Sequence, residues 1–258
     1  MTPLDALLVG GGAFLAGGMN ALAGGGSFFS FPALLAAGVP PVMANASNTV
    51  ALWPASLASA WAYRRELARH RAWVAVLSGV ALLGGALGGL LLLATSNASF
   101  TRLIPWLLLV ATLLFAFSDP IGRAVGKHRR IAERGAPRHG SVVGLLFQLA
   151  VAIYGGFFGA GQGILLLAAL SIQGIGDIQE LNAIKNWLSA IVYTVAALTF
   201  VAAQAVSWPH TLTMLATALL GGHAGAVLAR KLPARGLRWL VVGVGAALTL
   251  VYFVKTWR

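Results

Sequence analysis

Lys185 is the residue whose type and position point most strongly to chemistry. It lies in the segment LNAIKNWLSAIVYTV, residues 181–195, which carries no other charge. A cation inside a membrane segment is costly, and it usually serves a function such as holding an anion. Two alternatives stay open from the sequence. The ammonium group reaches the membrane surface, or it pairs with the acidic side chain of Glu180 or Asp177.

Amide and hydroxyl side chains stand at the start of two long apolar segments, one of which contains Lys185. The candidate substrate-binding side chains are Asn45, Asn48 and Thr49 in the first segment and Asn182, Lys185 and Asn186 in the second. Residues three or four positions apart share a face of a helix, so positions 182, 185 and 189 line up, as do 45, 48 and 52. Amide N–H and ammonium groups both donate hydrogen bonds, which suits an anionic ligand.

Glycine-rich breaks precede two short apolar segments, residues 27–38 and 163–173. The candidate substrate-binding residues at these breaks are Gly24, Gly25, Gly26 and Ser27 in the first half and Gly161, Gln162 and Gly163 in the second. A broken helix exposes backbone N–H groups at its N-terminus, and these groups favour an anion. Paired, interrupted short segments are typical of transporter binding sites. The alternative is that the glycines only allow close packing of helices.

The composition indicates the elements that must hold these residues. Hydrophobic residues make up 59% of the 258-residue chain and charged residues only 9%, against about 25% charged residues in a typical soluble domain. At roughly 20 residues per pass, the chain has room for about eight to ten passes. We therefore predict an all-α, polytopic helical bundle in the membrane. The apolar segments are 5–23, 27–38, 41–63, 73–95, 101–118, 141–159, 163–173, 180–203, 210–229 and 237–255.

Basic residues gather in three stretches between apolar segments, residues 64–71, 122–139 and 229–238. The net charge of +12 therefore fits cytoplasmic loops that face anionic lipid rather than a nucleic-acid surface. The expected partners are the lipid bilayer and a small anionic substrate, without nucleic acid and with a homo-oligomer as an open possibility. The expected location is the bacterial inner (cell) membrane, and the N-terminal segment is interpreted as a first membrane pass.

The chain repeats itself with a shift of 137 residues. The aligned pairs include Gly24 with Gly161, Gly26 with Gly163, Asn45 with Asn182 and Gly84 with Gly221. We predict a first membrane repeat at 1–120, a basic cytoplasmic linker at 121–139 and a second membrane repeat at 140–258. If all basic stretches face the cytoplasm, each half crosses an odd number of times and the halves enter from opposite sides. Two such inverted repeats, each with a broken short helix, are typical of carriers.

Enzyme and metal chemistry find little support in the sequence. Lys185 and Ser189 have the spacing of a Ser–Lys dyad, yet nothing else builds an oxyanion hole, so we predict no catalytic residue and no enzyme. The chain has no Cys, no HExxH motif and no acidic residue deep in a segment. We therefore expect no metal and no cofactor. His223 is interpreted either as a proton-coupling group or as a hydrogen-bonded packing residue.

Three stretches of the chain carry a family resemblance. They are AGGGSFFSFPALLAAGVPPVMANASNTVALWPASLASAWAYRREL at 23–67, GFFGAGQGILLLAALSIQGIGDIQELNAIKNWLSAIVYTVAAL at 156–198, and the C-terminal GGHAGAVLARKLPARGLRWLVVGVG. They resemble the paired motifs and the last helices of the sulfite exporter TauE/SafE family of membrane permeases. The motif positions in this chain are Gly24, Gly26, Pro32, Asn45, Asn48, Gly161, Gly163, Asn182, Lys185 and Asn186. The second motif departs from the family pattern at Gln162, where many members keep glycine, and it lacks a proline matching Pro32.

The resemblance implies a permease for sulfite, an organosulfonate or a related sulfur compound, working by alternating access. A sulfite or sulfonate head presents three oxygens with delocalised charge. Backbone N–H groups, amides and one ammonium group would bind those oxygens in place of water. Two other functions stay open: a passive anion channel, and a proton-coupled carrier of another small metabolite.

Overall fold

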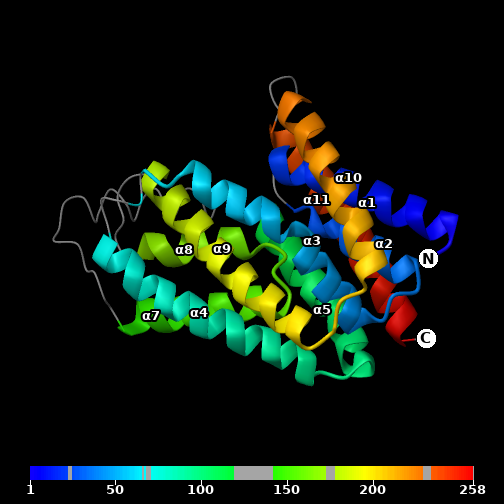
Figure 1. Cartoon of the computed structure of the whole chain (residues 1–258), viewed down its shortest axis with the longest axis horizontal. Helices are drawn as coiled ribbons and strands as arrows, with labels where there is room; N and C mark the ends of the chain where they lie inside the picture. The colour runs from blue at the N-terminus through cyan, green and yellow to red at the C-terminus, as the bar shows by residue number, and fades with distance from the viewer. Residues whose placement is uncertain are drawn as a thin grey trace. The chain divides into compact units, whose positions relative to one another are not determined.

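The computed structural model describes residues 1–22, 25–65, 67, 71–118, 142–172, 178–228 and 234–257. Within these ranges the chain forms ten α-helices and no β-strand. In sequence order (Figure 1) they are α1 (Pro3–Leu22), α2 (Ser27–Ala36), α3 (Pro41–Ala62), α4 (Arg71–Ala94), α5 (Asn97–Ala116), α7 (Val142–Phe157), α8 (Gln162–Ile172), α9 (Ile178–Ala202), α10 (Trp208–Leu228) and α11 (Ala234–Trp257). The predicted all-α fold is confirmed.

The helices are suited to an apolar environment. Four of those in the described part are long and apolar enough to cross a membrane, namely α4, α5, Glu180–Ala202 of α9 and Gly236–Trp257 of α11. Large apolar side chains stay exposed on their surfaces, for example Leu83 at 64% and Leu250 at 67%. A segment in lipid must satisfy its own backbone hydrogen bonds. Helices with apolar outer faces meet that requirement.

The two short apolar segments form separate short helices, α2 and α8. The residues before them include Gly25, with a φ angle of 81°, and Gly161, with a φ angle of 76°. Glycine adopts this left-handed backbone conformation without steric cost, and a right-handed helix cannot continue through it. The predicted break before each short helix is therefore confirmed. Gly24 lies outside the described residues.

The internal repeat is visible in the helix boundaries. The first half has helices α3, α4 and α5 beginning at Pro41, Arg71 and Asn97. In the second half, 137 residues later in each case, helices α9, α10 and α11 begin at Ile178, Trp208 and Ala234. The second half thus reproduces the helix pattern of the first. The opposite orientation of the two halves stays a prediction.

The chain divides into two compact units, each of which is described by itself. Unit 1 comprises Met1–Leu52, Leu92–Ala116 and Phe200–Arg258, and unit 2 comprises Trp53–Leu91 and Phe117–Thr199. Each unit combines helices from both sequence repeats, because unit 1 contains α1 and α10 whereas unit 2 contains α7 and most of α4. The predicted linker, 121–139, lies outside the described residues.

In unit 1, α1 and α10 lie side by side (Figure 1). Glycines allow their backbones to approach closely. A Cβ atom on Gly221 would overlap the carbonyl oxygen of Phe14, and one on Gly17 would overlap the carbonyl oxygen of Ala218. Close approach through small residues is how helices commonly associate in lipid, where burial of apolar surface gives little driving force.

Unit 2 contains the corresponding contact between α4 and α7. A Cβ atom on Gly84 would overlap the Ala152 side chain, and one on Gly88 would overlap the Ile153 carbonyl oxygen. The 137-residue shift aligns Gly84 with Gly221. Equivalent glycines therefore serve close packing in both halves, and for these glycines the packing interpretation holds.

Apolar side chains fill the interior of unit 2. Leu77 of α4, Leu166 of α8 and Leu188 of α9 are fully buried in one cluster. Full burial of such a side chain stabilises by about 1.5–3 kcal/mol. The cluster holds α8 against α9, and this contact determines where the polar residues of both helices lie.

Candidate functional site

The turn between α7 and α8 is shaped by two glycines and two tyrosines. Gly159 and Gly161 have φ angles of 78° and 76°. The Tyr154 hydroxyl donates to the Ala160 carbonyl oxygen at 2.5 Å, and the Tyr193 hydroxyl donates to the Gly159 carbonyl oxygen at 3.1 Å. The backbone that leads into α8 is therefore fixed from α7 on one side and from α9 on the other.

Neither tyrosine was among the predicted site residues. The sequence does hold a signal, because Tyr154 and Tyr193 are polar residues within apolar helices, and a buried tyrosine needs a partner for its hydroxyl. The identity of the partner depends on how the helices pack, and the sequence pattern alone does not specify that packing.

Lys185 lies beside the first turn of α8. Its Cδ atom is 3.8 Å from the position that a Cβ atom on Gly163 would occupy, and its side chain is half-buried. None of the residues that the structure describes, Glu180 included, forms an ion pair or hydrogen bond with Lys185. Asp177 lies outside the described residues. The predicted alternative of a Lys185–Glu180 pair is therefore not formed.

Gln162 is the first residue of α8 and is only 1% exposed. Neither the oxygen nor the nitrogen of its side-chain amide has a hydrogen-bond partner among the described residues. The side chain lies against Gly155, where a Cβ atom would overlap the amide carbon. An unsatisfied buried polar group costs about 1–3 kcal/mol, and nearly all such groups in proteins have partners. The Gln162 amide is therefore a candidate to bind a ligand.

The remaining polar residues of this region lie on α9. Asn182 and Asn186 flank Lys185 along the helix, and both are half-buried. The N-terminal end of α8 adds backbone N–H groups, because the first turn of a helix leaves them without intrahelical acceptors. The structure thus gathers hydrogen-bond donors and one positive charge around Gly163 in unit 2.

The glycine break in unit 1 is closed by its own hydrogen bonds. The Gly26 N–H donates to Asn20 Oδ1 at 2.9 Å. The Ser30 hydroxyl lies 2.6 Å from Asn48 Oδ1 and 3.4 Å from the Gly26 carbonyl oxygen. Asn20 and Ser30 were not predicted to take part, since they come from outside the repeated positions. They occupy groups that the sequence offered to a substrate.

The other predicted residues of unit 1 are also largely engaged. The Thr49 hydroxyl donates to the Asn45 carbonyl oxygen at 3.0 Å, and Asn45 is 1% exposed. Ser27 is half-buried. Because Asn48 and Thr49 have protein partners while Gln162 and Lys185 have none among the described residues, unit 2 contains the stronger candidate site.

His223 is exposed on α10 and forms no hydrogen bond with a described residue. The interpretation as a hydrogen-bonded packing residue is therefore wrong, and proton coupling stays a hypothesis. Within the described part of the chain, no group of three His, Cys, Asp or Glu side chains is placed to hold a metal ion.

Similar proteins are found among bacterial membrane transporters. A "Probable membrane transporter protein" of Haemophilus influenzae is 28% identical over 83% of this chain and 80% of its own length. "Probable membrane transporter protein ORF9" of a Sinorhizobium species is 27% identical over 92% of this chain and 88% of its own. "Probable membrane transporter protein YfcA" of Escherichia coli K12 is 25% identical over 92% of this chain and 85% of its own.

No solved structure matches this chain. The sulfite exporter TauE/SafE family matches residues 9–252, which is nearly the whole length. This match agrees with the paired motifs, with the two broken short helices and with the apolar surfaces of the long helices. The chain is an integral membrane protein and belongs to the sulfite exporter TauE/SafE family of permeases.

Proposed function

We propose that this permease moves a small sulfur oxyanion, sulfite or an organosulfonate, across the membrane, and that the anion binds at the N-terminal end of α8. The observation that carries the proposal is the free ammonium group of Lys185. It is half-buried beside Gly163, and no described residue supplies a counter-charge. An anion at this position would provide that counter-charge.

The donors around Gly163 fit an oxyanion in kind. Lys185 offers three N–H donors and Gln162 offers two. The N–H groups in the first turn of α8 add donors and a partial positive charge from the helix dipole. Hydrogen bonds from a charged donor to an anion are shorter and stronger than neutral ones. A tetrahedral or pyramidal oxyanion can accept from all three sources at once.

The scarcity of carboxylates also favours an anionic substrate. Of the residues that the structure describes, only Asp5 and Glu180 are acidic. Asp5 lies in unit 1, in the first turn of α1, where its carboxylate accepts from the Thr2 N–H at 2.7 Å. A site for a metal cation or an organic cation would need several oxygen ligands of this kind. The substrate class follows from this donor set together with the description of the family.

The repeated architecture supports alternating access as the mode of transport. Carriers built from inverted repeats bind substrate at broken helices and expose the site to each side in turn. Here both short helices follow left-handed glycines, and the helix starts recur at a constant spacing. A small anionic substrate and the lipid bilayer are accordingly the proposed partners.

The test is flux into proteoliposomes that contain the purified protein. Sulfite, an alkyl sulfonate, sulfate and chloride are compared, with and without the same anion trapped inside. We expect sulfite or sulfonate flux to saturate and to be accelerated by the trapped anion. Flux that rises linearly with concentration and is indifferent to the trapped anion would point to a channel. Absence of flux for both sulfur compounds, with another solute transported, would overturn the proposed substrate.

A further inference from the structure

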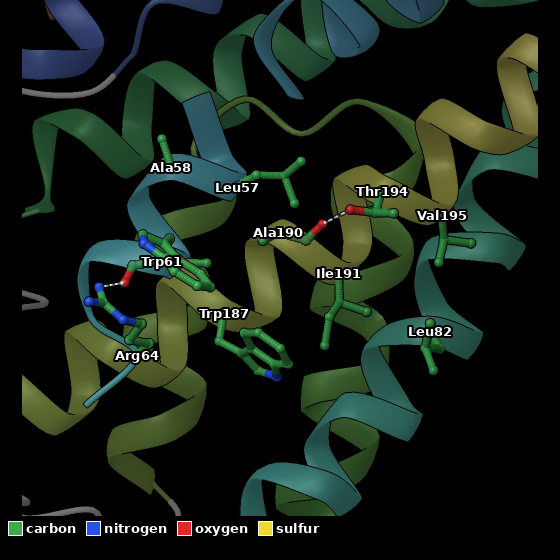
Figure 2. Close-up of a pocket in the computed structure, with 11 residues that line it drawn as sticks. Leu57, Ala58, Trp61, Arg64, Leu82, Trp187, Ala190, Ile191, Thr194 and Val195 are labelled. Atoms are coloured by element: carbon green, nitrogen blue, oxygen red, sulfur yellow. Dashed lines mark hydrogen bonds between the residues drawn. The ribbon is translucent and has the colours of Figure 1, made fainter. Parts of the chain in front are cut away.

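An apolar groove opens on unit 2, and no step of the proposed transport uses it. Its volume is about 630 Å³, and it is lined by the end of α3, by α4 and by α9 (Figure 2). Trp61 is 69% exposed, Leu82 47% and Trp187 38%. Because the chain is an integral membrane protein, a groove with such exposed apolar walls faces lipid rather than water.

The groove lies on a different face of α9 from the candidate anion site. Trp187, Ile191 and Val195 line the groove at four-residue intervals, so they share one face. Lys185 instead contacts α8, and Tyr193 bonds to the turn before α8. At 100° per residue, positions 187, 191 and 195 point roughly opposite to 185 and 193. A ligand in the groove would therefore not be the transported anion.

Most polar groups along the groove already have partners. The Trp187 Nε1–H donates to the Ser78 hydroxyl at 2.9 Å, and the Thr194 hydroxyl donates to the Ala190 carbonyl oxygen at 2.6 Å (Figure 2). Trp53 Nε1–H in turn donates to the Thr194 hydroxyl at 2.8 Å. The long wall of the groove is thus effectively apolar. It runs along α9 from residue 187 to residue 195, about 12 Å at 1.5 Å per residue.

Arg64 supplies the charge at one end of the groove. It is the charged residue among the described residues that line it. Its guanidinium carbon lies 4.7 Å from the centre of the Trp61 ring, and Nη1 donates to the Trp61 carbonyl oxygen at 3.0 Å (Figure 2). A guanidinium group has five N–H donors, so donors remain for a ligand. The stacking on Trp61 holds the group at the mouth of the groove.

We propose that this groove binds one anionic phospholipid, with the phosphate on Arg64 and an acyl chain along α9. The charge complementarity selects the occupant, because an arginine fork matches phosphate geometry while the remaining lining is apolar. Basic pockets between membrane helices commonly bind anionic headgroups on the cytoplasmic side, where the charge distribution places residues 64–71. Trp61 and Trp187 suit the boundary between headgroup and acyl chain.

The test is native mass spectrometry of the full-length protein in detergent, with phosphatidylglycerol or phosphatidylcholine added. Two pairs of variants isolate the groove. Arg64→Gln removes the cation at the mouth, and Arg102→Gln is its control, since Arg102 is an exposed arginine outside the groove. Ala58→Phe fills the groove from its exposed side, and Ala55→Phe is its control on the same helix outside the lining.

We expect the wild type to retain one phosphatidylglycerol more tightly than phosphatidylcholine. Arg64→Gln should lower the affinity for phosphatidylglycerol by about tenfold and erase the preference, because hydrogen bonds to charged groups contribute that order of free energy. Ala58→Phe should lower retention of both lipids. The two controls should bind as the wild type does.

Equal retention of the two lipids by the wild type, or an unchanged preference in Arg64→Gln, would overturn the proposal. If Ala58→Phe instead converted a dimer into monomers without changing lipid retention, the groove would be an interface between copies of the chain. Lys185→Met should keep the lipid, so this proposal and the proposed anion site can fail separately.

Discussion

Replacing Lys185 by Met is the sharpest test of the candidate anion site. Met keeps much of the length and the apolar stem of Lys, so the packing against Gly163 is retained while the ammonium group is lost. Hydrogen bonds to charged groups contribute about 1.5–3 kcal/mol. Because the side chain is half-buried, water screens part of this interaction. We therefore take the lower end and expect the KM for sulfite to rise about tenfold.

The same substitution should leave the fold intact. Lys185 forms no ion pair with a described residue, so its removal strands no buried counter-charge. The amount of monodisperse protein after extraction should match that of the wild type or exceed it. Sulfite flux into proteoliposomes gives the KM, and size-exclusion chromatography gives the folded yield from the same preparations.

Two variants serve as controls for this measurement. Lys255→Met removes an exposed lysine near the end of α11 and should not change the KM. Glu180→Gln should have little effect, because Glu180 does not pair with Lys185. A wild-type KM in Lys185→Met would refute the role of the ammonium group. A loss of folded yield in Lys185→Met that Glu180→Gln restores would show instead that the two side chains form a structural pair.

Three further predictions follow from the packing and the polar groups. Gln162→Leu should weaken sulfite transport and raise the thermal stability of the empty protein, since a buried amide without a partner costs about 1–3 kcal/mol; a fall in both quantities in thermal-shift and flux assays would contradict this. Gly17→Leu should reduce folded yield because its side chain would meet the Ala218 carbonyl, whereas Gly11→Leu on the same helix has open space and should not; equal yields by size-exclusion chromatography would count against close packing of α1 and α10. Single cysteines placed at 122–139 in this Cys-free chain should react with an impermeant thiol reagent only from the cytoplasmic side, and labelling from outside would reverse the predicted topology.

Much of the fold could be predicted because it depends on local properties of the sequence. The length of each apolar run determines whether a helix spans, and the positions of glycines determine where helices break. Gly25 and Gly161 illustrate this, since both adopt the left-handed conformation just before the short helices. The recurrence at 137 residues also required only comparison of the chain with itself.

The partners of the polar side chains could not be predicted in the same way. Asn45, Asn48 and Asn182 look equivalent in sequence, yet Asn48 accepts a hydrogen bond from Ser30, 18 positions away. The Tyr193 hydroxyl reaches the Gly159 carbonyl across 34 positions. Such bonds depend on which helix lies against which, and helical periodicity gives only the face that a residue occupies. The candidate site therefore narrowed to unit 2 only once the helices were in place.

The glycine breaks also show how two halves with one helix plan can acquire different chemistry. Position 162 aligns with position 25 under the 137-residue shift. At position 25 the backbone is left-handed, so a side chain there would be strained. In the second half the left-handed residue is Gly161, one position earlier, and α8 already begins at Gln162. A displacement of the break by one residue thus opened a position to side-chain variation, and after duplication the second half gained room for a substrate-selecting amide that the first half has no backbone to accept.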